Sequence, residues 1–157
     1  MEQTAQINLE YIMALHADLD PPQAIDSANL IFNAKGGWVD GPRIKAKLAA
    51  PAADWLQILP SGIWRIDVRG SMITDDGHPV YVSYNGTIAH SAQSAAKMAS
   101  GSPITHEDAP YFVIAPTFRT AADKYSWLNR IQAVGKAVRF STDPAHSFVR
   151  YDIFAIT

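Results

Sequence analysis

The sequence predicts a mainly β protein, built as a closed or nearly closed antiparallel barrel of about eight strands with one short helix. Stretches in which side chains alternate between apolar and polar recur along the chain, most clearly over Ile63–Thr74. Tight-turn signals separate these stretches, as at Asp75-Asp76-Gly77 and Asn85-Gly86. The chain has 157 residues, which fits one domain over residues 1–157 with a real hydrophobic core.

The first half of the chain supplies four strand candidates before the longest one. Leu9–Leu15 alternates with period two, and Asp20-Pro21-Pro22 ends it because proline cannot donate to a β-ladder. Ala28–Phe32 is a short apolar run. Arg43–Leu48 alternates basic with apolar residues, and Trp55–Leu59 precedes a Pro-Ser-Gly turn. Each of these stretches is therefore expected as a separate strand.

The long strand Ile63–Thr74 divides its side chains between two faces. One face carries Trp64, Ile66, Val68, Gly70 and Met72, and the other carries Arg65, Asp67, Arg69 and Ser71. Val80–Tyr84 is expected to pair back on this strand after the Asp-Gly turn. The alternation shows which residues share a face but does not show which face lies inside.

The second half of the chain is expected to hold the helix and the last strands. Ser91–Gly101 is rich in alanine, begins with a capping serine and ends with glycine, so it predicts a helix that covers an end or edge of the barrel. Tyr111–Thr120, Trp127–Val134 and Phe148–Phe154 are expected as strands.

Composition excludes several classes of protein. The net charge is −2 and no cluster of Lys or Arg appears, which argues against a nucleic-acid partner. The absence of cysteine excludes disulfides, thiolate metal sites and a cysteine nucleophile. No apolar run approaches the roughly 20 residues of a membrane span. Because Met1–Gln6 lacks the features of a secretory signal, we expect a cytoplasmic location.

No motif points to a cofactor. The sequence has no glycine-rich phosphate loop, no Gly-x-Ser-x-Gly elbow and no His-Glu-x-x-His helix. The five histidines are scattered without the spacing of metal ligands. We therefore expect neither a cofactor nor a metal.

Asp67 and Arg69 form the first candidate site, because they point the same way from one strand. Inside a barrel, the carboxylate of Asp67 could act as a general base and the guanidinium of Arg69 could stabilise an oxyanion. On the outside, the two would be a solvated pair worth about 0–1 kcal/mol. If they face the lumen, some apolar element must cover Trp64 and Ile66 outside the barrel.

Two further groups are candidates for the walls of a pocket. Asp54 and Trp55 begin a strand, where the aspartate could equally be serving turn chemistry. Tyr125, Trp127 and Asn129 share a face of the expected strand after residue 124, either as a satisfied core network or as an aromatic wall with one ligand-binding amide. Together with Tyr81, we expect these residues to bind substrate.

The sequence resembles a family of small bacterial and fungal β-barrel proteins catalogued as a domain of unknown function, whose fold is similar to the allene oxide cyclase barrel. The resemblance runs from about Leu9 to Phe154 through these motifs: Ala53-Asp54-Trp55, Gly62 with Asp67-Val68-Arg69, Thr74-Asp75-Asp76-Gly77, and Tyr125-Ser126-Trp127-Leu128-Asn129. The chain departs from the family pattern at Ala52-Ala53 and at Arg119-Thr120. The resemblance implies a barrel with an internal cavity lined by Asp67, Arg69, Trp127 and Asn129.

These observations favour a cofactor-independent lyase, isomerase or cyclase acting on a small, mostly apolar or aromatic carbonyl or hydroxyl compound. One alternative is a barrel that holds a hydrophobic ligand without reacting. Another is a structural subunit that buries its aromatic residues against a partner. Association into a homo-oligomer stays open, and no membrane partner is expected.

Overall fold

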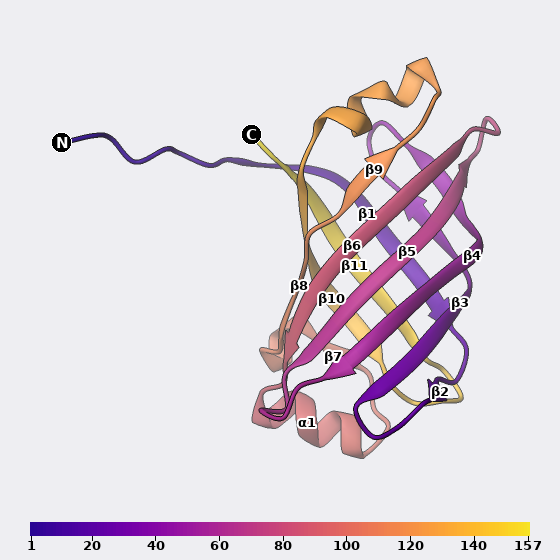
Figure 1. The fold of residues 1–157 in the computed structure, drawn as a ribbon, viewed down its shortest axis with the longest axis vertical. Helices are drawn as coiled ribbons and strands as arrows, with labels where there is room; N and C mark the ends of the chain where they lie inside the picture. Colours follow the sequence, from indigo (N-terminus) through magenta and orange to yellow (C-terminus); the bar gives the residue numbers. More distant parts are fainter.

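The computed structural model describes residues 1–157 and forms a closed antiparallel barrel (Figure 1). Eight strands make the closed path, in the order β1, β11, β10, β8, β6, β5, β4 and β3, with β3 pairing back to β1. Their bounds are β1 Leu9–Leu19, β3 Asn29–Asp40, β4 Lys45–Ile58, β5 Trp64–Thr74, β6 Pro79–Ala89, β8 Tyr111–Ile114, β10 Ala133–Ser141 and β11 Phe148–Ile156. The short strands β2 Gln23–Ala24, β7 Ile104–Thr105 and β9 Thr117–Arg119 pair with β3, β10 and β6.

Closure of the barrel depends on β1, which pairs antiparallel with both β11 and β3. Every other neighbouring pair on the path is also antiparallel. Closure gives each of these eight strands a hydrogen-bonded neighbour on both sides. The predicted fold class is therefore confirmed.

Alternation along the strands places the apolar face inside. On β5, Ile66 and Met72 are buried at 3% and 0% exposure, while Arg65 and Arg69 are exposed. The same interior receives Val80, Val82, Tyr84 and Ile88 from β6. The core is therefore the barrel interior itself.

The helical segments lie at opposite ends of the barrel. Figure 1 shows α1 (Ala92–Ala99) with the 3-10 turn η1 (His106–Asp108) at one end, and the 3-10 helix η2 (Asp123–Arg130) at the other. The predicted helix is confirmed, and Ser91 and Ser94 cap its first turn reciprocally. None of the helices is long and apolar enough to cross a membrane.

The prediction of two separate strands between residues 43 and 59 was wrong. The segments expected as two strands, 43–48 and 55–59, belong to the single strand β4. The ladder between β4 and β5 shifts register between Ala49 and Ala53. Pro51 lies in this bulge, where its missing N–H disturbs no regular pairing. The break between the two predicted strands is therefore a bulge within one strand.

The strand predicted over Trp127–Val134 was also wrong, because Asp123–Arg130 forms η2 and β10 begins only at Ala133. A 3-10 helix has a period of three, so residues three apart share a face. Tyr125 and Leu128 are accordingly the buried residues of η2. The period-two pattern of aromatic residues in this segment was therefore misleading.

Candidate active site

The barrel interior contains two adjoining cavities. The middle chamber has a volume of about 50 Å³ and is bordered by Leu48, Val68, Gly70, Val82 and Tyr84, among others. The α1 chamber, about 60 Å³, lies toward the end that carries α1 and is bordered by Trp64, Ile88, Phe112 and Phe140. Both chambers share these five residues: Leu19, Phe32, Asp54, Val149 and Tyr151. The two form one lumen with Asp54 at the junction.

Asp54 is the only carboxyl side chain that borders either chamber. Burial is the largest influence on it, and it raises the pKa of Asp54 to about 7. The backbone N–H of Asp67, which donates to Asp54 Oδ1 at 3.0 Å, opposes this rise, and the nearby Asp67 carboxylate adds to it. An acid with this pKa can both lose and gain a proton near neutral pH.

The ladder of hydrogen bonds between β4 and β5 is interrupted next to Asp54, where its side chain accepts a hydrogen bond from β5. Residue pairs between β4 and β5 are matched at Asp54 with Val68 and again at Gln57 with Arg65, but not in between. Asp67 N–H, in this gap, donates to the Asp54 side chain. The carboxyl group is thus fixed by backbone, which positions it more firmly than another mobile side chain would.

Two tyrosines place hydroxyl groups near Asp54. Tyr84 and Tyr151 are 6% and 2% exposed, and their rings meet edge to face at 5.7 Å. Burial is the main cause that raises the pKa of both hydroxyls, and the charge of Asp54 adds to the rise. Both tyrosines therefore keep their protons at neutral pH and can donate hydrogen bonds to an oxygen in the lumen.

Aromatic rings line the α1 chamber. Phe112 packs edge-on against Phe140 at 5.1 Å and against Tyr151 at 5.5 Å, which suits the chamber to a flat apolar group. No Lys, Arg or His borders either chamber. No group of three His, Asp or Glu side chains in the chain is arranged to hold a metal ion.

The structure overturns the predicted orientation of Asp67 and Arg69. Val68 and Gly70 border the lumen, so the alternating Asp67 and Arg69 lie on the outer face of β5, with Arg69 exposed. No ion pair joins the two side chains. The physical reason lies in the opposite face of β5. Burial of Ile66 and Met72 in the core removes more apolar surface from water than a covering element outside the barrel would. Asp67 acts on the site through its backbone N–H and through the charge of its carboxylate, which adds to the rise in the pKa of Asp54.

The other predicted wall residues do not meet in the lumen, although Trp55 and Tyr81 border one outer hollow together with Arg69. Asp54 lies in the lumen, whereas Trp55 and Tyr81 are on the outer surface at 49% and 46% exposure. Tyr125 belongs to the buried face of η2, and its hydroxyl donates a hydrogen bond to Asp76 Oδ1 at 2.7 Å.

Trp127 and Asn129 belong to the same helical end rather than to the lumen. Trp127 is half-buried beneath the guanidinium of Arg43, whose Cζ lies 4.2 Å from the ring centroid. Asn129 is exposed and exchanges two hydrogen bonds with the backbone of Thr120. The residues expected to form an aromatic wall of the pocket therefore belong to η2, and their contacts fix η2 to the end of the barrel.

Sequence reasoning missed Tyr84 and Tyr151 as site residues. The signal was present, because Tyr84 shares the face of Val80 and Val82, and Tyr151 shares the face of Val149 and Ile153. A tyrosine on a strand face that is otherwise aliphatic brings one hydroxyl into the interior.

Comparisons with known proteins place this geometry in a family. A family model described as "Protein of unknown function (DUF3237)" matches residues 7–156. A conserved protein of unknown function from Rhodopseudomonas palustris is 25% identical with a TM-score of 0.86, covering 99% of this chain and 100% of that one. A β-barrel-like protein from Acinetobacter baumannii is 28% identical with a TM-score of 0.78 and full coverage of both chains. An enzyme from Penicillium herquei shares the fold at 18% identity and a TM-score of 0.68, covering 100% of this chain and 99% of that one.

Proposed function

The chain belongs to the DUF3237 family, and we propose that this member is a cofactor-independent lyase, isomerase or cyclase that transfers protons within its lumen. The observation that carries the proposal is Asp54, the single carboxyl group of a mostly apolar lumen, with its pKa raised to about 7. Perturbed carboxyl groups in clefts are frequent acid–base catalysts. The enzyme from P. herquei with a similar fold adds support at the level of architecture.

The chemistry follows from the positions of three side chains. Ionised Asp54 takes a proton from a carbon next to a substrate carbonyl, and the electrons of the C–H bond move onto the carbonyl oxygen. Tyr84 or Tyr151 donates a hydrogen bond to that oxygen and stabilises the enolate. Neutral Asp54 then returns the proton to another carbon, or to a leaving oxygen, which gives isomerisation or elimination with no external reagent.

The lining also indicates the substrate class. An anionic substrate would lie beside Asp54 with no cation to pair with, and burying an unpaired charge is costly. We therefore propose a small, uncharged, mostly apolar or aromatic compound bearing a carbonyl or hydroxyl group. Each chamber is smaller than the roughly 150 Å³ cavity that holds benzene, so entry requires movement of partly exposed lining side chains such as Phe32 and Phe148.

Proton abstraction can be tested without knowing the product. Phenylacetone in D₂O exchanges the protons beside its carbonyl for deuterium when a base removes them, and NMR follows this loss. We expect the protein to accelerate the exchange and Asp54→Asn to slow it by about 100-fold or more. Asp67→Asn, on the outer face, is the matched control and should retain most of the exchange.

Binding separates the enzyme from a carrier. Phenylacetone should perturb lumen resonances in both wild type and Asp54→Asn, whereas phenylacetate should not bind. Binding without accelerated exchange would identify a non-catalytic ligand-binding barrel. Binding of neither compound would contradict the proposed site.

An interaction role is the second candidate, and the outer face of the barrel favours it. Trp55, Arg69 and Tyr81 border an open hollow beside the β4 bulge, and both aromatic rings are strongly exposed. Exposed aromatic and arginine side chains are enriched at protein interfaces. If this face joins copies of the chain, Trp55→Ser should shift the elution volume in sizing chromatography from oligomer to monomer.

A further inference from the structure

His90 presents an anomaly that the proposed chemistry does not use. It lies between the end of β6 and Ser91, the N-cap of α1. Its Nε2 is the one buried side-chain nitrogen or oxygen of the chain without a hydrogen-bond partner. Buried polar atoms are almost always paired, so an exception needs an explanation.

The surroundings of His90 connect α1 to the wall of the lumen. The imidazole ring stands edge-on to Trp64 at 4.8 Å and lies 6.4 Å from Phe140, and both of these residues border the α1 chamber. Its Nδ1 lies 3.3 Å from Oγ of Ser94, which is fully buried in the first turn of α1. His90 therefore contacts both the helix and the chamber wall.

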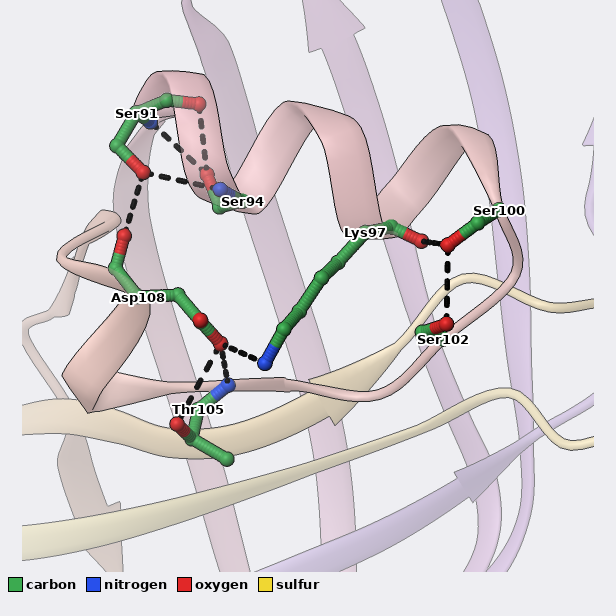
Figure 2. Close-up of polar contacts among 7 residues, drawn as sticks. All are labelled: Ser91, Ser94, Lys97, Ser100, Ser102, Thr105 and Asp108. Carbon is green, nitrogen blue, oxygen red and sulfur yellow. Dashed lines mark hydrogen bonds and ion pairs between the residues drawn. The ribbon is translucent and has the colours of Figure 1, made fainter.

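The helix and η1 are tied to each other, as Figure 2 shows. Lys97 Nζ donates to Asp108 Oδ2 at 2.8 Å, and the same oxygen accepts from Thr105 N–H at 2.8 Å. The Ser91 hydroxyl donates to the backbone oxygen of Asp108. On the barrel side, α1 buries Ser94 and packs Met98 partly against the core, while most of its other residues are exposed. The helix itself is thus held to the barrel by few apolar contacts, whereas the chain after it is anchored by β7, where Ile104 is fully buried and pairs with β10.

The charged side chains around His90 do not offset the positive charge that its imidazole would carry when protonated. Lys97 and Asp108 pair with each other, Glu107 and His106 are exposed on η1, and Arg65 and Arg139 are exposed on β5 and β10. Burial is the one cause that acts on His90, and it lowers the pKa of the imidazole. A protonated ring would leave an uncompensated charge against Trp64 and Phe140.

We propose that His90 is a protonation-sensitive latch, which holds α1 against the end of the barrel while the imidazole is neutral and releases it when the imidazole gains a proton. Release would uncover Trp64 and Phe140, which contact His90 and border the α1 chamber. The latch controls access to the chamber and does not require that Asp54 be catalytic.

The direction of the pH effect follows from linkage. When α1 is released, His90 is solvated and its pKa takes the ordinary value of about 6.5, whereas burial lowers this pKa in the docked state. The docked state is therefore favoured fully above this value and loses stability as the pH falls below it. The opening equilibrium rises at most tenfold for each unit of difference between the two pKa values.

Amide hydrogen exchange of α1, corrected for the intrinsic rate, tests the latch without any ligand. Between about pH 8 and pH 5, opening of Ala95–Met98 should increase by about threefold or more in the wild type. His90→Phe keeps an aromatic ring against Trp64 but cannot titrate, so its opening should not change with pH. His106→Phe, on the exposed face of η1, should behave as the wild type does.

Asp54 titrates in the same range, so Asp54→Asn is measured in parallel and should retain the wild-type pH dependence. NMR titration of His90 in the wild type provides a second measurement that does not depend on a variant. Its midpoint should lie below 6.5 and should coincide with the shift of the Met98 methyl resonance. An unchanged pH dependence in His90→Phe, or a Met98 resonance that does not follow His90, would overturn the latch.

Discussion

The two ends of the barrel use the same alternation of residues but differ in packing. At the η2 end, Met13, Met72 and Val80 are completely buried and η2 adds Tyr125 and Leu128, so the interior is solid. Toward α1 the interior is hollow and contains Asp54. We call these the packed end and the hollow end.

The size of the side chains accounts for the difference. The inward positions around the middle chamber include Ala17, Ala34, Ala52 and Gly70, which leave space that methionine and isoleucine fill at the packed end. A Cβ at Gly70 would approach the Cβ of Ala52 to 3.0 Å, so the wall there is close-packed although the lumen beside it is empty. The interior is therefore filled at the packed end, and the space for chemistry lies in the middle and toward the hollow end.

The largest predicted effect is on the packed end. Met72→Ala should lower the free energy of unfolding by about 2–5 kcal/mol, because it removes a fully buried side chain from a filled core. Leu48→Ala, at a partly exposed side chain that already borders the middle chamber, should cost about half as much or less. Denaturant unfolding of both variants measures the difference, and equal losses would contradict the division into two ends.

A second prediction concerns the hollow end, where Asp54 should make the free energy of unfolding depend on pH. The pKa of Asp54 is raised in the folded state, so its contribution is present at low pH and is lost as the pH rises from about 4 through 7. With allowance for its partial exposure, the wild type should lose on the order of 2 kcal/mol relative to Asp54→Asn across this range. Unfolding of both proteins at several pH values measures this, and parallel curves would show that Asp54 is not desolvated.

A smaller effect is expected when volume is added instead of removed. Ala46→Val, at a buried position of the packed end, should destabilise by about 1–3 kcal/mol through overpacking. Ala34→Val points into the middle chamber and should change stability by less than about 1 kcal/mol while weakening ligand binding. If Ala34→Val is as damaging as Ala46→Val, the middle chamber is not free space.

The sequence allowed prediction of the barrel because period two, hairpin turns and one capped helix are local signals. It did not reveal the orientation of β5, because alternation is symmetric between inside and outside. The identity of the residues could have decided it: Trp64, Ile66 and Met72 have more to gain from burial than Asp67 and Arg69.

Asp54 could be predicted as a pocket residue but not as its centre. Its position depends on the bulge at Ala49–Ala53 and on the Asp67 N–H that the opened ladder leaves available, and both arise from pairing between strands. The packing role of Tyr125 likewise depends on Asp76, which lies 49 positions away in the sequence. Contacts of this range are not encoded in local periodicity.

The central claim is that the lumen holds one desolvated carboxyl group fit for acid–base chemistry. Carbon-13 NMR titration of the Asp54 carboxyl carbon tests it directly, with Asp54→Asn to assign the signal. The account predicts a midpoint near pH 7. A midpoint near 4, the ordinary value for a solvated aspartate, would contradict it.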